Sequence, residues 1–367
     1  DESLRELGSR LVIRQGPSLE TLNELIEESG AESVYWNRLY EPEVIERDKR
    51  IKKSLRENNI AAHSHNAALL CEPWQIETKT GGPYKVFTPF WRSLAQRQMQ
   101  NPLAMPESLP KVWPKIGSIS VDELKLLPQI DWDTGIRATW SPGEEGAHAE
   151  LEGFLDEPVE QYDQDRDRPA RTGTSHLSPH LHFGEIGPRQ IWHRVHEYLA
   201  DNPGKDIKRN TDRFLSEVGW REFGHHLLYH FPHTPEVSLD DRFKHFPWSD
   251  NKKALQAWQQ GQTGIPMVDA GMRELWHCGW MHNRVRMVVA SFVTKNLLIP
   301  WQQGAAWFWD TLVDADLANN TLGWQWVAGS GADAAPYFRI FNPALQGERF
   351  DPQGEYVRKW VPEIAAL

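Results

Sequence analysis

Hydrophobic and polar residues follow one another in the first 70 residues in a way that is typical of alternating strands and helices. Short apolar runs predict strands, and segments with apolar residues at helical spacing predict helices between them. The predicted strands are 11–13, 33–36 and 60–62, and the predicted helices are 18–30 and 44–55. This alternation predicts a parallel, doubly wound sheet. Two or three strands are too few for a complete sheet of this kind, so we expect the chain to start inside such a domain.

The remaining chain changes character twice. Residues 71–143 are rich in Pro, Gly and Trp, as expected for an interdomain linker with some packing of its own. From 144 onward the pattern is helical, most clearly at 211–231 and 265–299. The predicted fold class is therefore α/β plus all-α: a partial doubly wound parallel α/β domain at 1–70, the linker, and a large helical domain at 144–367.

The most apolar stretch, from Val285 to Pro300, is too short to cross a bilayer and is interrupted by Arg286 and Lys295. It predicts a buried core helix, so we expect no membrane partner. The chain opens with charged residues rather than an apolar leader. Its two cysteines, Cys71 and Cys278, provide no disulfide framework, which favours a reducing compartment and a cytoplasmic protein.

The formal net charge of −11 argues mildly against binding to nucleic acid, since phosphate contacts need local positive potential. A cationic face can nevertheless coexist with an acidic remainder. Arg166, Arg168 and Arg171 lie close together in the chain and are candidates for such a face. The alternative is that these arginines are scattered, solvated charges.

Tryptophan is unusually frequent, at 18 of 367 residues. Indoles provide large stacking surfaces and are readily oxidised, so this excess suggests ring-shaped ligands or redox chemistry. The alternative is that the tryptophans fill a large core.

Common nucleotide and metal motifs are absent from the sequence. There is no Gly-x-Gly-x-x-Gly after a strand and no Gly-x-x-x-x-Gly-Lys loop. His226 and His230 have the spacing to share a helix face, but no His-Glu-x-x-His pattern accompanies them. We therefore expect no metal site.

The segment 172–178 offers hydroxyl groups and a flexible backbone just before a predicted helix. Such a segment can hold a phosphate through backbone N–H groups and the positive helix end. The alternative is an ordinary loop that caps the helix and binds nothing.

Three further segments combine aromatic, amide and charged residues. The first two repeat the i, i+3, i+4 spacing of one helix face, and the third collects two acids, two amides and two tryptophans. They are Glu217 with Trp220 and Arg221, Asn283 with Arg286 and Met287, and residues 314–326. Together they predict a pocket that stacks flat rings and forms hydrogen bonds with their edges.

These residues belong to longer motifs that resemble the DNA photolyase/cryptochrome family. The motifs are Gly173-Thr-Ser-His-Leu-Ser-Pro, Trp220-Arg-Glu-Phe, Gly279-Trp-Met-His-Asn-Arg-Val-Arg-Met, Gly323-Trp-Gln-Trp and Ala335-Pro-Tyr-Phe-Arg-Ile-Phe-Asn-Pro, with Phe87-Thr-Pro-Phe-Trp in the linker. They occur in the order of the family and resemble most the class I cyclobutane pyrimidine dimer photolyases.

The resemblance implies that the helical domain holds FAD in a folded conformation. Residues on the phosphate and ribose side would be Tyr162, Thr174, Ser175, His176, Leu177 and Ser178, and those on the other side Arg286, Asp314, Ala315 and Asp316. It also implies an ion pair between Arg286 and Asp314. Asn320 would lie opposite flavin N5, where an amide can form a hydrogen bond with the reduced flavin without adding charge.

The resemblance further implies repair of pyrimidine dimers in double- or single-stranded DNA, driven by blue light, by a monomeric enzyme. Photolyases turn the lesion out of the duplex. Trp220 and Trp326 would stack on the dimer, and Glu217, Asn283 and Met287 would line its pocket. Residues implied to contact DNA are Arg166, Glu217, Trp220, Arg221, Asn283, Arg284 and Arg339.

Three more tryptophans, Trp248, Trp301 and Trp324, match the electron-transfer chain of the family, which carries electrons to oxidised flavin. The alternative is that these are three core indoles. The α/β domain of many members also binds an antenna chromophore, a folate or a deazaflavin. Glu41 matches a position that contacts a folate antenna, but the resemblance implies that further strands of that domain would precede Asp1.

Three functions remain open from the sequence: a dimer photolyase, a cryptochrome-type blue-light photoreceptor that binds FAD without repair, and an inactive flavin-binding remnant. Asn320 and Trp326 favour the first over the second. Members specific for (6-4) lesions carry a His-His pair where this chain has His282 and Asn283, so the resemblance favours cyclobutane dimers.

Overall fold

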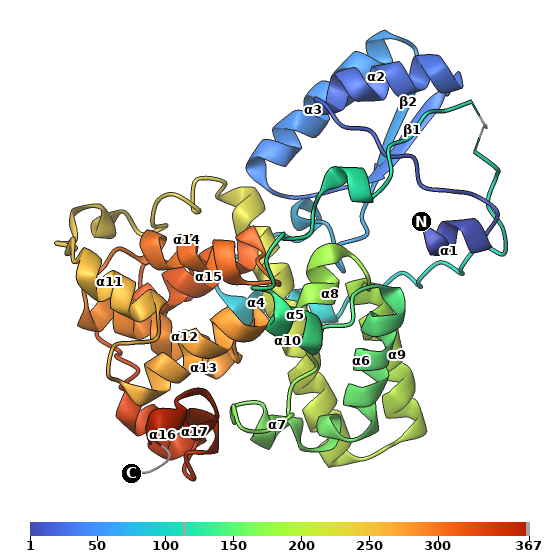
Figure 1. Ribbon diagram of the computed structural model, residues 1–367. Coiled ribbons are helices and arrows are strands. Elements are labelled where there is room, and N and C mark those ends of the chain that lie inside the picture. Colours follow the sequence, from blue (N-terminus) through green and yellow to red (C-terminus); the bar gives the residue numbers. More distant parts are fainter. Residues whose placement is uncertain (113–114, 365–367) are drawn as a thin grey trace. The chain divides into compact units, whose positions relative to one another are not determined.

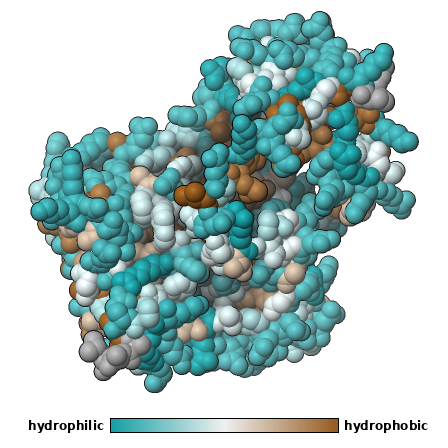
Figure 2. Space-filling model, viewed as in Figure 1, coloured by the Kyte–Doolittle hydropathy of each residue, from teal (hydrophilic) through white to brown (hydrophobic). Residues whose placement is uncertain are grey.

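The computed structural model describes residues 1–112 and 115–364, which form two compact units (Figure 1). Unit 1 comprises the described residues within Asp1–Leu39, Glu43–Ala67 and Asn101–Trp132, and unit 2 those within Tyr40–Pro42, Ala68–Gln100 and Asp133–Leu367. The segment that the sequence predicts to be a linker is thus divided between the two units. The visible surface is mostly hydrophilic (Figure 2), in keeping with a chain in which 25% of the residues are charged.

Unit 1 contains a two-stranded parallel sheet, as the alternating pattern predicted. Its elements are α1 (Glu2–Glu6), α2 (Ser18–Ser29), β1 (Ser33–Asn37), α3 (Pro42–Glu57), β2 (Ala61–His65) and a 3₁₀ turn (Asp122–Leu124). Ser33 lies opposite Ala61 in the sheet. Gly30 ends α2 in the left-handed conformation that glycine adopts without steric cost. The core of the unit is small, with Leu55 fully buried beside Ile51.

The predicted strand at 11–13 is wrong: these residues are extended but join no sheet. The backbone N–H of Ile13 donates to the Ser118 hydroxyl at 2.8 Å, and the N–H of Ile119 donates to the Ile13 carbonyl at 3.1 Å. A single backbone bond with a neighbouring segment is too little for a ladder. Val12 and Ile13 are half-buried and Leu11 is exposed, so the apolar run is not a strand.

Unit 2 is built from helices, which confirms the predicted all-α part. They are α4 (Phe87–Ala95), α5 (Thr134–Thr139), α6 (Glu144–Asp156), α7 (Tyr162–Asp165), α8 (Ser178–Phe183), α9 (Pro188–Asp201), α10 (Lys205–His230), α11 (Lys252–Gln259), α12 (Pro266–Cys278), α13 (Asn283–Ser291), α14 (Trp301–Thr311), α15 (Leu317–Ala328), α16 (Pro343–Phe350) and α17 (Glu355–Trp360). Short 3₁₀ turns occur at Pro73–Gln75, Pro158–Gln161, Asp241–His245 and Pro362–Ile364, and α13 continues into a π-helical turn, Phe292–Asn296.

Two apolar clusters form the core of unit 2. One gathers around α4, α6, α9 and α10, and the other around α12 to α15. Val285, Val289 and Val293 are completely buried in the second cluster, so the apolar stretch 285–300 is a core segment as predicted. Among the described residues, no helix has the length and apolar character needed to cross a bilayer. Cys71 and Cys278 are both buried and unpaired.

A buried acid joins α17 to α12. The Tyr356 hydroxyl donates to Glu274 Oε2 at 2.6 Å, and both residues are buried. Burial raises the pKa of Glu274 to about 7, although the hydrogen bond from Tyr356 opposes this by favouring the carboxylate. The carboxyl group therefore holds a proton in the folded protein at pH values where it would be ionised in the unfolded chain.

This raised pKa predicts a pH-dependent stability. Because the folded state holds the proton more tightly, the contribution of Glu274 is complete below the ordinary pKa of 4.5 and is lost as the pH rises to about 7. The loss is at most about 3 kcal/mol. Glu274→Gln keeps an acceptor for Tyr356 but does not titrate, so wild type should lose stability relative to this variant between pH 5 and pH 8.

The measurement is the unfolding midpoint of both proteins across that range. Glu355→Gln, at an exposed position of α17, is the matched control. A constant difference between wild type and Glu274→Gln at all pH values would contradict the assignment.

Candidate active site

A cavity of about 390 Å³ lies in unit 2, with walls from α10, α13, α15 and the segment before α15. This volume is within the usual range for sites that bind small molecules and cofactors. Most residues that the sequence singled out line it: Arg166, Glu217, Trp220, Asn283, Arg284, Arg286, Met287, Asp314, Ala315, Asp316, Asn320, Trp324 and Trp326. Segments up to 160 residues apart in the chain thus supply one site.

The α10 wall presents Trp220 and Glu217, one turn apart. The Trp220 ring stacks on Phe87, with centroids 3.8 Å apart and planes within 9°. Since Phe87 covers one face of the indole and is itself buried, only the other face of Trp220 can stack on a ligand. Arg166 donates to Glu217 Oε1 at 2.5 Å, which fixes the carboxylate next to this aromatic surface.

The α15 wall begins with a buried ion pair. Asp316 caps α15 by accepting the Asn319 backbone N–H at 2.8 Å, and it lies 3.3 Å from His225 Nε2. Burial favours the neutral form of His225, but Asp316 outweighs burial and raises the pKa of this histidine. Burial likewise opposes ionisation of Asp316, yet His225, Arg221 and the Asn319 N–H hold its pKa below the usual range. The pair is therefore charged, and it fixes the start of α15 against α10.

Asn320 lies one turn further on, with its amide orientation set by α14. Its Nδ2 donates to the Ala305 carbonyl at 2.9 Å. The NH₂ group is thereby engaged, so the carboxamide oxygen is the atom left to accept a hydrogen bond in the cavity.

Several polar atoms of cavity residues are buried without a hydrogen-bond partner in the described part of the chain. The expected ion pair is present, with Arg286 Nη2 donating to Asp314 Oδ2 at 2.8 Å, but Asp314 Oδ1 has no partner. The same holds for Arg166 Nε, Arg284 Nε and Trp324 Nε1. Because buried polar groups are nearly always hydrogen-bonded, these atoms fit a site that a polar ligand completes.

The three tryptophans expected in an electron-transfer chain share the second apolar cluster. Trp324 lines the cavity and is 2% exposed, Trp301 is 1% exposed, and Trp248 lies half-buried at the edge of the cluster. Trp301 Nε1 donates to the Ser238 hydroxyl at 3.1 Å. Trp258, which the sequence reasoning did not single out, packs edge-on to Trp324 at 6.1 Å.

Other predicted residues lie away from this cavity. Tyr162 is buried in the first apolar cluster against Phe154 and Phe214, and none of Thr174, Ser175, His176, Leu177 or Ser178 lines the cavity. His176 instead stacks on Trp280 at 4.5 Å. The segment is nevertheless close to a cavity wall, since a Cβ at Gly173 would lie 2.8 Å from the backbone of Asp165, next to Arg166.

Arg221 and Arg339 also lie elsewhere. Arg221, predicted to contact DNA, points inward and donates to the Ala68 carbonyl at 2.6 Å, with a side chain only 12% exposed. Contact between Arg221 and DNA stays a prediction. Arg339 is exposed, its guanidinium lies 5.1 Å from the Phe341 ring centroid, and its carbonyl accepts from Lys295 at 2.8 Å.

Sequence reasoning missed several residues at the cavity. Phe87 was noted only as part of a motif, and Asp167 and Arg213 were not singled out, although both line the cavity. Arg213 lies i−4 from Glu217 and i−7 from Trp220, a spacing that could have identified it on the same helix face. Glu41, the candidate antenna contact, has a buried Oε2 without a partner among the described residues; the antenna stays a prediction.

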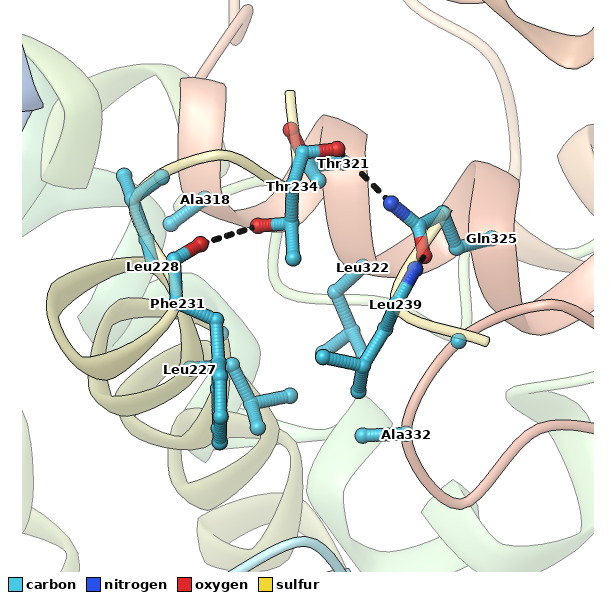
Figure 3. Close-up of a pocket in the computed structure, with 12 residues that line it drawn as sticks. Leu227, Leu228, Phe231, Thr234, Leu239, Ala318, Thr321, Leu322, Gln325 and Ala332 are labelled. Atoms are coloured by element: carbon cyan, nitrogen blue, oxygen red, sulfur yellow. Dashed lines mark hydrogen bonds between the residues drawn. The ribbon is translucent and has the colours of Figure 1, made fainter. Parts of the chain in front are cut away.

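A second, smaller cavity lies between α10 and α15 (Figure 3). Leu227, Phe231 and Leu322 form part of its wall, and Gln325 closes one side by donating to the Thr234 carbonyl at 2.7 Å. At about 20 Å³ it has room for one water and not for a substrate. Within the described residues, no group of three His, Cys, Asp or Glu side chains could hold a metal ion.

Comparison with known proteins gives a consistent result. Residues 1–110 match the family described as DNA photolyase, and residues 214–367 match the FAD binding domain of DNA photolyase. The chain is 50% identical to the deoxyribodipyrimidine photo-lyase of Agrobacterium fabrum, over all of this chain and 76% of that protein. It is 38% identical to cryptochrome-1 of Arabidopsis thaliana, over all of this chain and 55% of that protein.

Among solved structures, a bacterial class III photolyase from Agrobacterium tumefaciens superposes with a TM-score of 0.95 at 49% identity, over 99% of this chain and 75% of that one. The sequence motifs predicted a class I member. Since this similar structure is of class III, the class of the present chain stays a prediction.

The position of Trp324 at the cavity depends on a glycine of α14. A Cβ at Gly304 would lie 2.1 Å from the Trp324 ring, closer than any two such atoms can approach. Gly304→Ala must displace the indole or the helix, and overpacking of this kind costs about 1–3 kcal/mol. The unfolding midpoint should therefore fall. Gly153→Ala, in α6 with open space around its Cβ position, should be neutral or stabilising; equal effects of the two substitutions would contradict this packing.

Proposed function

Because the chain belongs to the DNA photolyase/cryptochrome family, we propose that it is a deoxyribodipyrimidine photolyase that repairs cyclobutane pyrimidine dimers under blue light. The observation that supports this most is the composition of the 390 Å³ cavity. It combines indole surfaces suited to flat bases with a buried set of carboxylate, guanidinium and amide groups suited to a polar cofactor.

The described residues fit FAD as the cofactor. Asp314, Arg284 and Trp324, each with a polar atom that lacks a partner, line a cavity that has room for a flavin-sized ring system. Bound there in its reduced form, FAD supplies the light-excited electron that splits the dimer. The Arg286–Asp314 pair would hold the polar edge of the cofactor, and the Asn320 oxygen would accept from the N5–H of the reduced flavin. Tyr162 and residues 174–178 stay proposed contacts of the phosphate and ribose side.

We propose that the lesion enters the same cavity after turning out of the DNA. Trp220 would stack on the dimer with its free face, while Phe87 supports the other. Trp326, Asn283 and Met287 would form the remaining walls. A dimer is poorly stacked in its duplex, so it costs less to turn out than intact bases, and this supplies part of the selectivity.

The tryptophans Trp324, Trp301 and Trp248 are proposed to carry electrons from the surface to the cofactor. Trp324 lines the cavity, Trp301 is buried in the core, and Trp248 lies half-buried at the edge of the cluster. These positions support this order. Trp324 Nε1 has no hydrogen-bond acceptor among the described residues.

A cryptochrome-type photoreceptor is the second candidate, and the 38% identity with a plant cryptochrome favours it. Such a protein would bind FAD and signal without repairing DNA. Asn320 and Trp326 at the cavity argue for repair. The two candidate functions differ in whether the protein binds dimer-containing DNA more tightly than undamaged DNA.

Trp220→Ala tests the stacking role. The variant should bind a dimer-containing oligonucleotide more weakly, by about 1–3 kcal/mol for each base that loses its stacking partner. Its affinity for undamaged DNA should change little, so the preference for the lesion falls. Trp192→Ala removes an indole that packs on the same apolar cluster but lies outside the cavity, and serves as control. Unchanged dimer affinity in Trp220→Ala would refute the assignment.

Trp324→Phe tests the electron-transfer role. The variant should lose photoreduction of oxidised flavin, followed by absorbance under blue light, yet repair dimers normally once its flavin has been reduced chemically. Trp258→Phe changes a fully buried neighbour in the same cluster and should photoreduce like wild type. The role of Trp324 fails if its variant photoreduces at the wild-type rate.

A further inference from the structure

Arg213 occupies the same face of α10 as Glu217 and Trp220, because positions four and seven residues apart align along a helix. Its side chain is exposed and lines the cavity. The residue therefore lies at the rim, where the cavity meets solvent, rather than among the buried groups inside.

The charge of Arg213 distinguishes it from the other arginines of the cavity. Arg166 pairs with Glu217 at 2.5 Å, Arg284 with Asp167 at 2.7 Å and Arg286 with Asp314 at 2.8 Å. Around Arg213, in contrast, no carboxylate of residues 1–112 or 115–364 comes within 4.0 Å of the guanidinium. Its potential carboxylate neighbour on the helix, Glu217, is already bound to Arg166, and Asp212 is bound to Lys208.

We propose that Arg213 is a positioning residue that binds a backbone phosphate of the DNA strand whose lesion enters the cavity. The proposal rests on the proposed function and names one more residue of that site. An unpaired guanidinium is suited to a phosphate, which it can contact with two parallel hydrogen bonds. In a chain with a net charge of −11, such a contact needs a local cation that is not already neutralised.

The phosphate could come from the DNA or from the pyrophosphate of the cofactor, and the exposure of Arg213 favours DNA. A cofactor phosphate would be held by buried groups, whereas a strand that passes across the rim meets exposed ones. Arg213 touches no reacting atom in this arrangement, so it should affect binding and not the chemical step.

The test compares Arg213→Ala and Arg213→Lys with Arg209→Ala. Arg209 lies one turn earlier on α10, but its guanidinium is within 3.3 Å of Asp206 and 3.7 Å of Asp163, and it does not line the cavity. Dissociation constants for dimer-containing and undamaged oligonucleotides are measured between 50 and 200 mM salt, together with the flavin content of each purified protein.

Arg213→Ala should bind both oligonucleotides more weakly at low salt, with the slope of log K against log salt reduced by about one. The loss of affinity across this salt range then becomes about fourfold smaller than in wild type. Arg213→Lys should retain most of the slope, because lysine keeps the charge, and Arg209→Ala should match wild type. Flavin content and the repair rate at saturating DNA should be unchanged in all three.

A wild-type slope in Arg213→Ala would overturn the proposal. Loss of flavin with an unchanged slope would also overturn it, and would assign the phosphate to the cofactor instead. The salt slope is measured on undamaged DNA as well, so the role of Arg213 is tested independently of lesion repair. The proposed function, in contrast, fails if the wild-type protein shows no preference for dimer-containing DNA.

Discussion

Helix α10 crosses α15 at Gly224, where an added Cβ would lie 3.1 Å from the Asn319 carboxamide oxygen and 3.4 Å from the Ala318 backbone. At the next residue of α10, the His225–Asp316 ion pair joins the same helix to the start of α15. This contact sets both walls of the large cavity, because α10 carries Trp220 and α15 carries Asn320. The site therefore depends on one close helix–helix approach, at which a side chain at position 224 would crowd α15.

Charge inside the cavity is almost fully balanced, which explains how an acidic chain can hold several arginines there. Each buried guanidinium has a carboxylate partner, since an unpaired buried charge would be strongly destabilising. Atoms such as Asp314 Oδ1 that lack partners then mark where a ligand would complete the network. Arg213 is an exception: its side chain is exposed to solvent, where an unpaired cation is only slightly destabilising.

Sequence reasoning identified much of the cavity because its residues lie in short motifs at helical spacing. It also predicted α2, β1, α3 and β2, since their apolar patterns match the burial seen. It failed at 11–13, where an apolar run without a pairing partner resembles a strand. It did not foresee that Arg221 points inward, and it did not single out Phe87 or Arg213. The face that a side chain takes depends on how helices pack, and a pattern along one helix does not contain that information.

The most direct test of the account is blue-light repair of a thymine-dimer oligonucleotide by the purified, reduced protein, with a sample kept in the dark. A cavity that holds both flavin and lesion predicts loss of the dimer in the light and none in the dark. A protein that retains bound FAD but leaves the dimer intact in the light would contradict the photolyase function and favour a photoreceptor.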